Sequence, residues 1–147
     1  MNSREIPTLL KIIQTDYYSF LSVIFLLILW SVFTISQILQ LESPSGVIYI
    51  ALALSVFAIV VIIWRFQTIQ SLFSSGVVTL ATITEIWFFR GRGRINYTYS
   101  NRGHEFLTGD DVVPTNRTRS LQTADRVTIL IDPENPERTV IYDIYFD

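Results

Sequence analysis

The chain has 147 residues, of which 50% are hydrophobic and only 16% are charged, and its net charge is −2. Soluble domains carry about 25% charged residues, so this composition favours a chain that lies partly in lipid and leaves room for one small soluble domain. With a net charge of −2, the chain has no global electrostatic field that would recruit nucleic acid or an anionic membrane. The absence of cysteine excludes disulfides, thiolate metal sites and cysteine nucleophiles.

Residues 1–16 are expected to form an N-terminal segment at a membrane surface. Ser3 is a candidate helix cap, and Pro7 fits a first helical turn. Two interpretations are open, an amphipathic helix in the plane of the interface and an extension of the following span. The apolar residues at helical spacing are Ile6, Leu9, Leu10 and Ile13.

Two apolar runs predict a transmembrane helical hairpin over residues 17–66. Residues 18–39 and 47–64 contain no Asp, Glu, Lys, Arg or His. As helices they are about 33 Å and 27 Å long, which suits a hydrocarbon core of about 30 Å. Pro44 and Gly46 in the short connection favour a turn. A cleaved signal peptide has a shorter apolar core, of roughly 7–15 residues, so we expect both spans to be retained.

The positive residues predict the orientation of the hairpin. Arg4 and Lys11 precede the first span and Arg65 closes the second, whereas the only charge between the spans is Glu42. The positive-inside rule then places both termini and the β-domain in the cytoplasm, and we expect a bacterial plasma membrane or an equivalent inner membrane. Spans without ionisable groups argue against a pump, a proton relay or an ion-coupled transporter.

Four residues of the spans are candidate contacts with a partner protein. Trp30 lies mid-span, where its indole N–H has no water, so it is expected to face a protein neighbour. Ala51, Ser55 and Ala58 share one helix face, and small residues allow another helix to approach closely. This face either packs on the first span, which we favour, or receives a helix of another subunit.

Residues 67–76 are expected to link the hairpin to a soluble β-domain over residues 77–147, with Gly76 ending the helix. Beyond Gly76 the apolar period changes from that of a helix to that of a strand. The fold class is therefore a transmembrane helical hairpin followed by a small antiparallel β-barrel or sandwich of about five strands. The expected strands cover residues 77–89, 95–100, 104–108, 126–131 and 139–146, and the last would place Val140, Tyr142, Ile144 and Phe146 on one side.

Arg90, Arg92 and Arg94 alternate with two glycines between strands that are expected to pair. We interpret this stretch as a hairpin tip that the arginines keep soluble, so replacing all three with serine should leave the fold intact. Contact with anionic lipid or an acidic partner is the alternative. Nucleic acid is disfavoured, because phosphate binding needs a broad basic surface.

The residues that carry chemistry are sparse. His104 is the only histidine, and its neighbour Glu105 would point to the opposite face of a strand. We therefore expect no metal site, no cofactor and no catalytic residue, and the chain is not expected to be an enzyme. Residues 109–125 show no period and are expected to form a long loop with a short helix near 117–124, a candidate recognition surface.

Residues 132–137 predict a rigid corner between two strands. Asp132 can close an Asx turn, Pro133 fixes its own φ, and Pro136 keeps Asn135 out of the helical region. The sequence lacks the spacing, the central glycine and the terminal Glu of a calcium loop.

Taken together, these features resemble a widespread, uncharacterised family of small two-span membrane proteins. The resemblance rests on the two spans, a Gly-Val-Val opening of the β-domain, a Tyr-x-Tyr ahead of a Gly turn, and the Asp-Pro-x-Asn-Pro corner at residues 132–136. It runs from about Trp30 onward and implies an architecture but no catalytic residues. Ala124-Asp125 departs from the family, in which a glycine often precedes the penultimate strand. Proteins with a membrane-tethered oligonucleotide/oligosaccharide-binding barrel have a similar layout but match the corner less well.

The function expected from the sequence is that of a non-catalytic, membrane-anchored accessory or scaffold subunit of a larger membrane protein complex. Its partners would be the lipid bilayer and other membrane subunits. The alternative is a lipid- or small-ligand-sensing module in which Trp87, Tyr97 and Tyr99 line a pocket, although strand alternation favours a core position for these aromatics. A hydrolase using His104 is the least favoured hypothesis.

Overall fold

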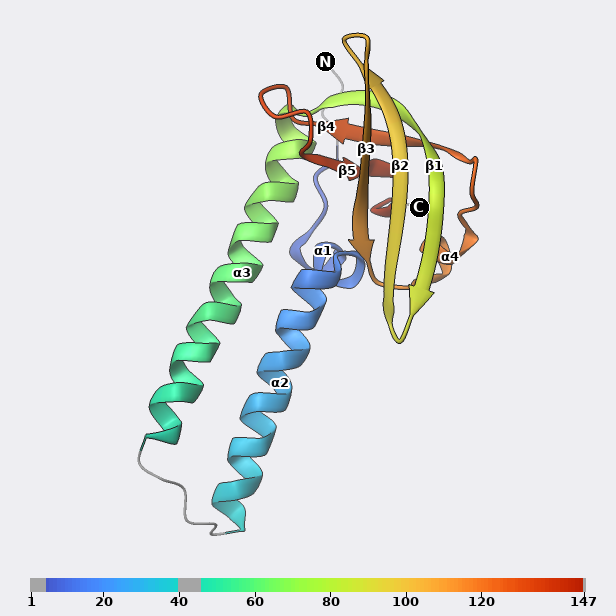
Figure 1. The fold of residues 1–147 in the computed structure, drawn as a ribbon. Helices are drawn as coiled ribbons and strands as arrows, with labels where there is room; N and C mark the ends of the chain where they lie inside the picture. Colours follow the sequence, from blue (N-terminus) through green and yellow to red (C-terminus); the bar gives the residue numbers. More distant parts are fainter. Residues whose placement is uncertain (1–4, 40–45, 147) are drawn as a thin grey trace.

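The protein consists of a hairpin of two long apolar helices and a five-stranded antiparallel sheet that curls into a half-barrel (Figure 1). This computed structural model describes residues 5–39 and 46–146. Ser3, Arg4, Glu42 and Pro44, which entered the expectations on capping, orientation and the connecting turn, lie outside the described residues.

Helix α1 (Leu9–Thr15) is a separate short helix and not an extension of the first span. Its N-cap is Thr8, whose hydroxyl accepts a hydrogen bond from the Lys11 N–H at 3.3 Å. The face that packs on the rest of the protein contains Ile12 and Thr15, whereas Leu9 and Leu10 are exposed. The expected helix is therefore present, but a different face of it is buried.

Helices α2 (Tyr17–Ile38) and α3 (Val47–Ser75) pack side by side, and both are long and apolar enough to cross a membrane. Residues 67–75, expected as a linker, form the last two turns of α3. This end of α3 is buried because Ile69, Leu72 and Phe73 pack against the β-domain. The helix ends where the Gly76 N–H donates to the Leu72 carbonyl at 2.8 Å.

The sheet contains β1 (Val77–Phe89), β2 (Arg92–Asn101), β3 (His104–Val112), β4 (Arg126–Ile131) and β5 (Thr139–Ile141). Its order is β3-β2-β1-β4-β5, and every neighbouring pair is antiparallel. The prediction of five antiparallel strands is confirmed, with β2 and β3 longer than expected. The sheet is an open half-barrel with β3 and β5 at its edges, so it is neither a closed barrel nor a two-sheet sandwich.

The expectation of a last strand over residues 139–146 was wrong beyond Ile141. Residues Tyr142–Ile144 form a 3-10 helix, η1. The Asp143 carboxylate accepts the Thr128 N–H of β4 at 2.7 Å, so a side chain takes the place of a further strand contact. Tyr142, Tyr145 and Phe146 instead pack their rings on Phe73 of α3.

The expected loop of residues 109–125 is shorter than predicted. Its first four residues belong to β3, where they pair with β2. Helix α4 (Asn116–Ser120) follows, capped by reciprocal hydrogen bonds between Thr115 and Thr118. A short helix was expected nearby, at 117–124.

The concave face of the sheet forms the core together with α1 and the end of α3. Ile83, Ile95, Tyr97 and Ile129 are fully buried on this face. Burial raises the pKa of the Tyr97 hydroxyl well above its ordinary value, and this hydroxyl is satisfied by Thr139 at 2.8 Å. The interpretation of Tyr97 and Tyr99 as core residues is therefore confirmed.

The corner at residues 132–137 forms two consecutive Asx turns. The Asp132 carboxylate accepts the Glu134 N–H at 3.0 Å, and the Asn135 side chain accepts the Glu137 N–H at 3.2 Å. Arg138 pairs with Asp132 at 3.3 Å, and the Tyr99 hydroxyl donates to the Pro136 carbonyl. The corner is thus held by side chains on both sides and joins β4 to β5.

Ala124, one of the two residues noted above as departing from the expected family pattern, has a left-handed φ of 72°. Its N–H donates to the Ile83 carbonyl at 2.8 Å, so the strained backbone is held by β1. The left-handed region costs an L-residue roughly 1–2 kcal/mol, and glycine at this position would avoid that cost. Part of this gain would be lost, because glycine makes the unfolded chain more flexible. Ala124→Gly should therefore raise the free energy of unfolding by about 0.5–1 kcal/mol, measured by thermal unfolding in detergent. A lower melting temperature for the glycine variant would contradict this.

Candidate functional site at the helix–sheet junction

The residues predicted to contact partners do not gather at one place. Arg90 lies at the tip between β1 and β2, where it and Gly91 have φ values of 46° and 82°. Arg92 and Arg94 belong to β2, so the expectation that all three arginines form the tip was wrong. Gly93 is a strand residue as well, and the Phe88 ring occupies the space that a Cβ there would need.

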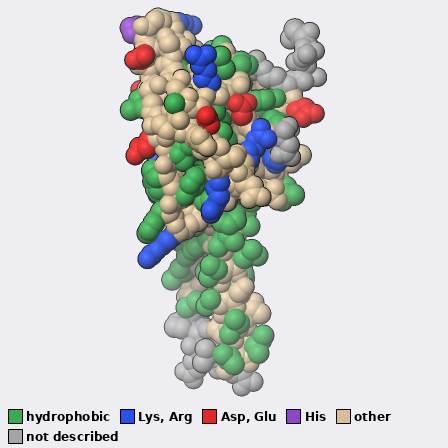
Figure 2. Space-filling view, turned by 90° about the vertical axis from the view of Figure 1, so that its right-hand side faces the viewer, with side chains coloured by type: hydrophobic (Ala, Val, Ile, Leu, Met, Phe, Trp, Pro, Cys, Tyr) green, Lys and Arg blue, Asp and Glu red, His purple; other side chains and the backbone are tan. Residues whose placement is uncertain are grey.

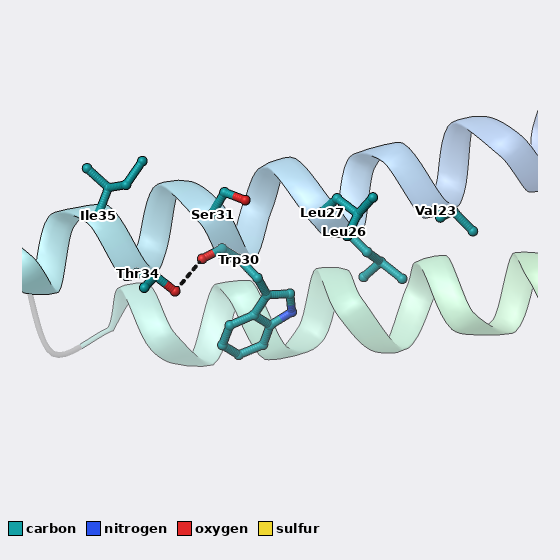
Figure 3. Close-up of a pocket in the computed structure, with 7 residues that line it drawn as sticks. All are labelled: Val23, Leu26, Leu27, Trp30, Ser31, Thr34 and Ile35. Carbon is teal, nitrogen blue, oxygen red and sulfur yellow. Dashed lines mark hydrogen bonds between the residues drawn. The ribbon is translucent and has the colours of Figure 1, made fainter.

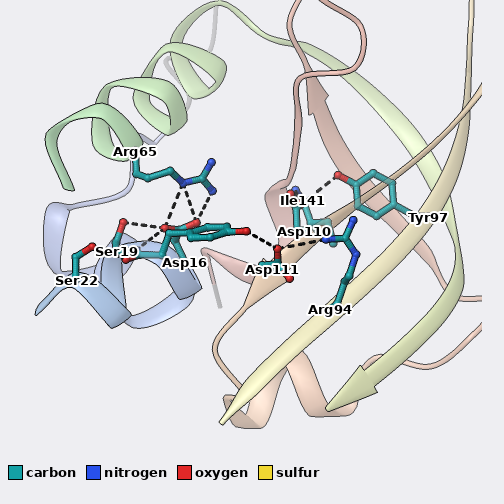
Figure 4. Close-up of polar contacts among 10 residues, drawn as sticks. Asp16, Ser19, Ser22, Arg65, Arg94, Tyr97, Asp110, Asp111 and Ile141 are labelled. Carbon is teal, nitrogen blue, oxygen red and sulfur yellow. Dashed lines mark hydrogen bonds and ion pairs between the residues drawn. The ribbon is translucent and has the colours of Figure 1, made fainter. Parts of the chain in front are cut away.

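The polar side chains that do gather lie where the hairpin meets the sheet, a region we call the junction (Figure 4). Its first centre is Asp16, between α1 and α2. The Asp16 carboxylate accepts the N–H and the hydroxyl of Ser19, both at 2.8 Å, and so caps α2. Arg65 of α3 donates to both carboxylate oxygens of Asp16, through Nε at 3.2 and 3.3 Å and through Nη2. The Asp16 side chain is only 1% exposed, so this ion pair is buried on the aspartate side.

The backbone around Asp16 also pairs with the end of β3. Asp16 forms an isolated antiparallel bridge with Val112, and the Val113 N–H donates to the Thr15 carbonyl at 2.9 Å. Asp16 therefore caps the start of α2, pairs with Arg65 of α3 and bridges the edge strand β3 through its backbone.

The second centre of the junction is Asp111 of β3. Its carboxylate accepts the Tyr18 hydroxyl of α2 at 3.0 Å, Arg92 at 2.8 Å and Arg94 at 3.2 Å. The hydrogen bond to Asp111 raises the pKa of the Arg92 guanidinium above its ordinary value. Because the Asp111 side chain is 6% exposed, the two arginines and the tyrosine provide the polar contacts that water would otherwise supply.

A row of hydrogen bonds extends from Asp111 across the convex face of the sheet. Arg94 also donates to the Asn96 side-chain oxygen at 3.0 Å, and the Asn96 amide donates to Glu85 of β1 at 2.8 Å. Gly109 of β3 leaves room for this row, because a Cβ there would collide with the Asn96 side chain.

On the concave face, Asp110 connects the two edges of the half-barrel. Its carboxylate accepts the Ile141 N–H of β5 at 3.0 Å and the Tyr97 hydroxyl at 3.2 Å (Figure 4). Burial raises the pKa of Asp110 to about 6, against the opposing effects of these hydrogen bonds and of Arg65. Asp110 thus holds β5 close to β3 in a position where its negative charge is unfavourable.

Asp110 should make the stability of the β-domain depend on pH. The folded carboxyl keeps its proton up to about pH 6, whereas the unfolded one releases it near pH 3.8, so stability falls as the pH rises through this window. The total effect is roughly 3 kcal/mol at 1.36 kcal/mol per unit. Asp110→Asn should remove this contribution. The melting temperature of Asp110→Asn minus that of the original protein should therefore be larger at pH 7.5 than at pH 4.5. An unchanged difference at the two pH values would contradict the assignment.

Aromatic rings and arginines form a belt at the level of the junction. The Arg65 guanidinium lies 5.6 Å from the Tyr18 ring centre and 5.9 Å from that of Trp64. The Arg92 guanidinium lies 5.5 Å from the Tyr17 ring centre and 5.7 Å from that of Trp87. Such amphipathic aromatic and cationic side chains are typical of a membrane–water interface.

Within the hairpin, Trp30 and the small-residue face of α3 meet each other. The Trp30 indole donates to the Ser55 hydroxyl at 3.1 Å, and Ala51, Ser55 and Ala58 are buried. The small-residue face therefore packs inside the hairpin, as we favoured, and is not left open for another helix.

Open apolar surface is present along both helices, and one stretch of it on α2 is hollowed. This stretch is a shallow, open depression of about 670 Å³ along α2, lined by α2 side chains alone (Figure 3). Ser31 and Thr34 supply its hydroxyl groups, and Thr34 donates to the Trp30 carbonyl at 2.8 Å. We call this surface the α2 groove; its residues are Val23, Leu26, Leu27, Trp30, Ser31, Thr34 and Ile35.

The residues considered for catalysis or ligand binding are dispersed. His104 is exposed at the start of β3, and no group of three His, Cys, Asp or Glu side chains within residues 5–39 and 46–146 is arranged to hold a metal. Tyr97 and Tyr99 lie in the core, whereas Trp87 pairs in register with Arg94 on the convex face. These three aromatics therefore do not line a common pocket.

Comparison of the chain with protein-family models, with curated proteins and with solved structures gives no match. The resemblance to the uncharacterised two-span family stays a prediction.

Sequence reasoning missed the junction. A signal for part of it was available, because Asp16 and Arg65 are the charges that border the two apolar runs. Acidic and basic residues at the same end of two antiparallel helices are close enough to pair. No comparable signal pointed to Asp111, whose partner Tyr18 lies 93 positions away.

Proposed function

We propose that this protein is a non-catalytic, membrane-anchored accessory or scaffold subunit of a larger membrane protein complex. The hairpin of α2 and α3 lies in the bilayer, and the β-domain sits at the cytoplasmic surface and contacts other subunits. A bacterial plasma membrane, or an equivalent inner membrane, is the proposed location.

One observation carries this proposal, namely that the hairpin exposes large apolar side chains on all sides. Leu27 of α2 is 60% exposed and Phe57 of α3 is 68% exposed. On the face that Figure 2 draws, many hydrophobic side chains lie on the surface of the helical hairpin below the β-domain. A continuous apolar surface of this size requires lipid or protein to cover it. Other examples are Ile28, Val32, Ile35, Ile38, Tyr49, Ile50, Val56 and Val60.

The junction supports a scaffold role. Asp16 and Asp111 connect α2 and α3 to β2 and β3, so the sheet is held at a defined angle to the hairpin. A β-domain with such an attachment presents its surface to neighbours in a constant orientation. The α2 groove offers a complementary site inside the bilayer, where a helix of another subunit can pack.

The orientation proposal follows from the charges at the junction. Arg65 and the arginines of β2 lie at the end of the hairpin that carries the β-domain, and this is the end that the positive-inside rule assigns to the cytoplasm.

Native purification in a mild detergent tests the proposal. An accessory subunit should copurify with other membrane proteins in a fixed ratio, identified by mass spectrometry. Because the chain has no cysteine, Ser31→Cys introduces a single thiol in the α2 groove. A thiol-reactive photocrosslinker there should give one discrete adduct with a copurifying subunit. Val56→Cys on α3, exposed but outside the groove, is the matched control.

Two results would contradict the proposal. One is a protein that purifies alone from the membrane and forms no adduct through residue 31. The other is a full-length protein that stays soluble and monomeric in water. A protein that purifies alone and melts at a higher temperature when a lipid or small molecule is added would instead support the sensing module.

A further inference from the structure

We infer that the tip of the β1–β2 hairpin is a second membrane contact, in which Phe89 enters the lipid interface and Arg90 binds anionic headgroup phosphates. This inference rests on the proposed function, because it needs the helical hairpin to lie in a bilayer. We call Trp87, Phe89, Arg90 and Gly91 the β1–β2 tip.

The β1–β2 tip lies next to an arginine that contacts the first residue of α2. The Arg92 guanidinium, next to the turn, lies 5.5 Å from the ring centre of Tyr17, where α2 begins. Arg92 pairs in register with Phe89. The tip therefore lies at the level where the chain enters the proposed bilayer. Figure 1 shows the β1–β2 tip pointing in the direction in which α2 runs, and the β2–β3 turn pointing the opposite way.

The chemistry of the β1–β2 tip suits a lipid interface. Phe89 is 63% exposed, and the Arg90 guanidinium lies 5.1 Å from the centre of its ring. Arg92 and Arg94 are bound by Asp111, whereas Arg90 forms no ion pair within the described residues. An apolar ring with an arginine above it can bury the ring at the acyl boundary and leave the charge among the phosphates.

The other hairpin turn of the sheet provides an internal comparison. Arg102 and Gly103, between β2 and β3, have φ values of 52° and 82°, nearly the same as those of Arg90 and Gly91. The residues around this turn are polar, namely Ser100, Asn101, His104 and Glu105. The two turns therefore share a backbone conformation and an arginine, and they differ in the aromatic residues Trp87 and Phe89, which belong to the β1–β2 tip.

A basic residue of α4 adds to the positive charge near the β1–β2 tip. The Arg119 guanidinium lies 5.9 Å from the ring centre of Phe88, the residue before Phe89. A Lys or Arg near an anionic membrane surface is attracted to the lipid headgroups. Arg90 and Arg119 thus favour an anionic leaflet over a neutral one.

The test uses the full chain in lipid nanodiscs that contain a neutral lipid with or without about a third of anionic phosphatidylglycerol. Arg90→Cys and Arg102→Cys each receive the same environment-sensitive fluorophore. A spin-labelled lipid should quench the label at residue 90 several-fold more than the label at residue 102, and an aqueous quencher should show the reverse order. Equal access of the aqueous quencher to both labels would overturn the inference.

A third label at Phe57→Cys distinguishes this inference from the proposed function. If lipid quenches the label at residue 57 but only the aqueous quencher reaches the label at residue 90, the helical hairpin is in the bilayer and the β1–β2 tip is not a membrane contact. That result would point to an acidic protein as the partner of Arg90. If the aqueous quencher reaches the label at residue 57, the proposed placement of the helical hairpin in the membrane is rejected.

A fluorophore attached to Phe89→Cys tests the role of the Arg90 charge. Lipid quenching there should increase when phosphatidylglycerol is present, and Arg90→Ser should remove the increase. Arg102→Ser in the same background is the matched control and should have no effect. An increase that survives Arg90→Ser would exclude a headgroup contact by this arginine.

Discussion

Replacing Asp16 with alanine should lower the free energy of unfolding by about 3–5 kcal/mol, because it removes one partner of a buried ion pair. Arg65 would keep a guanidinium that is only 21% exposed and has lost its carboxylate. The start of α2 would lose the cap that Asp16 provides to Ser19. The hydrogen bonds that hold the hairpin to the edge of β3 should then weaken as well.

Thermal unfolding in detergent, followed by near-ultraviolet circular dichroism, measures this effect. A loss of 3–5 kcal/mol corresponds to a decrease in melting temperature of roughly 10 °C at 2–4 °C per kcal/mol. Arg138→Met is the matched control, since its ion pair with Asp132 is more exposed, at 38% for the arginine side chain, and should contribute less than about 1 kcal/mol.

The double variant Asp16→Ala with Arg65→Met separates the ion pair from the cap. Replacing both charges removes the uncompensated guanidinium, so the double variant should be more stable than Asp16→Ala alone. A double variant that loses the sum of the two single effects would show that Asp16 and Arg65 stabilise the fold independently. An Asp16→Ala variant that melts like Arg138→Met would refute the central place of the junction.

Phe73→Ala should have the second large effect, a loss of about 3–5 kcal/mol, since a fully buried aromatic side chain is removed from a packed core. Phe73 lies near the end of α3, and its ring centre is 5.4 Å from those of Tyr142 and Tyr145 and 5.7 Å from that of Phe146. The cavity would therefore open between α3 and the C-terminal residues.

Hydrogen exchange and thermal unfolding check this prediction together. Backbone amides of η1 should exchange faster in Phe73→Ala, and the melting temperature should decrease. Phe57→Ala in the same helix is the matched control, because Phe57 is exposed and should change the melting temperature little. Equal effects of the two variants would mean that the end of α3 does not pack on the C-terminal residues as described.

The helical hairpin and the central strands could be predicted because each has a continuous local signal. Two uncharged runs, each long enough to cross a bilayer, predict membrane-spanning helices. The many β-branched residues of β1 and β4 predict strands. The corner at Asp132 was predictable for the same reason, since the turn chemistry of Asp and Pro acts within a few residues.

The features that escaped prediction depend on contacts between distant residues. The stretch after Ile141 alternates like a strand, but Asp143 binds Thr128 and the aromatic residues pack on Phe73, so the chain turns into η1. Gly93 and Arg94 look like turn residues, yet β3 extends to Val112 and pairs with them. The candidate site was missed because its ion pairs join residues 17 to 49 positions apart.

The double role of Asp16, which begins α2 and pairs with the edge of β3, has a mechanical consequence. A helix that is longer than the bilayer is thick adjusts by tilting. In the proposed setting the sheet would follow that tilt as a rigid extension of α2, so a change in bilayer thickness would swing the β2–β3 turn through an arc above the membrane. The angle at which neighbours meet the β-domain would then vary with the lipids around the hairpin.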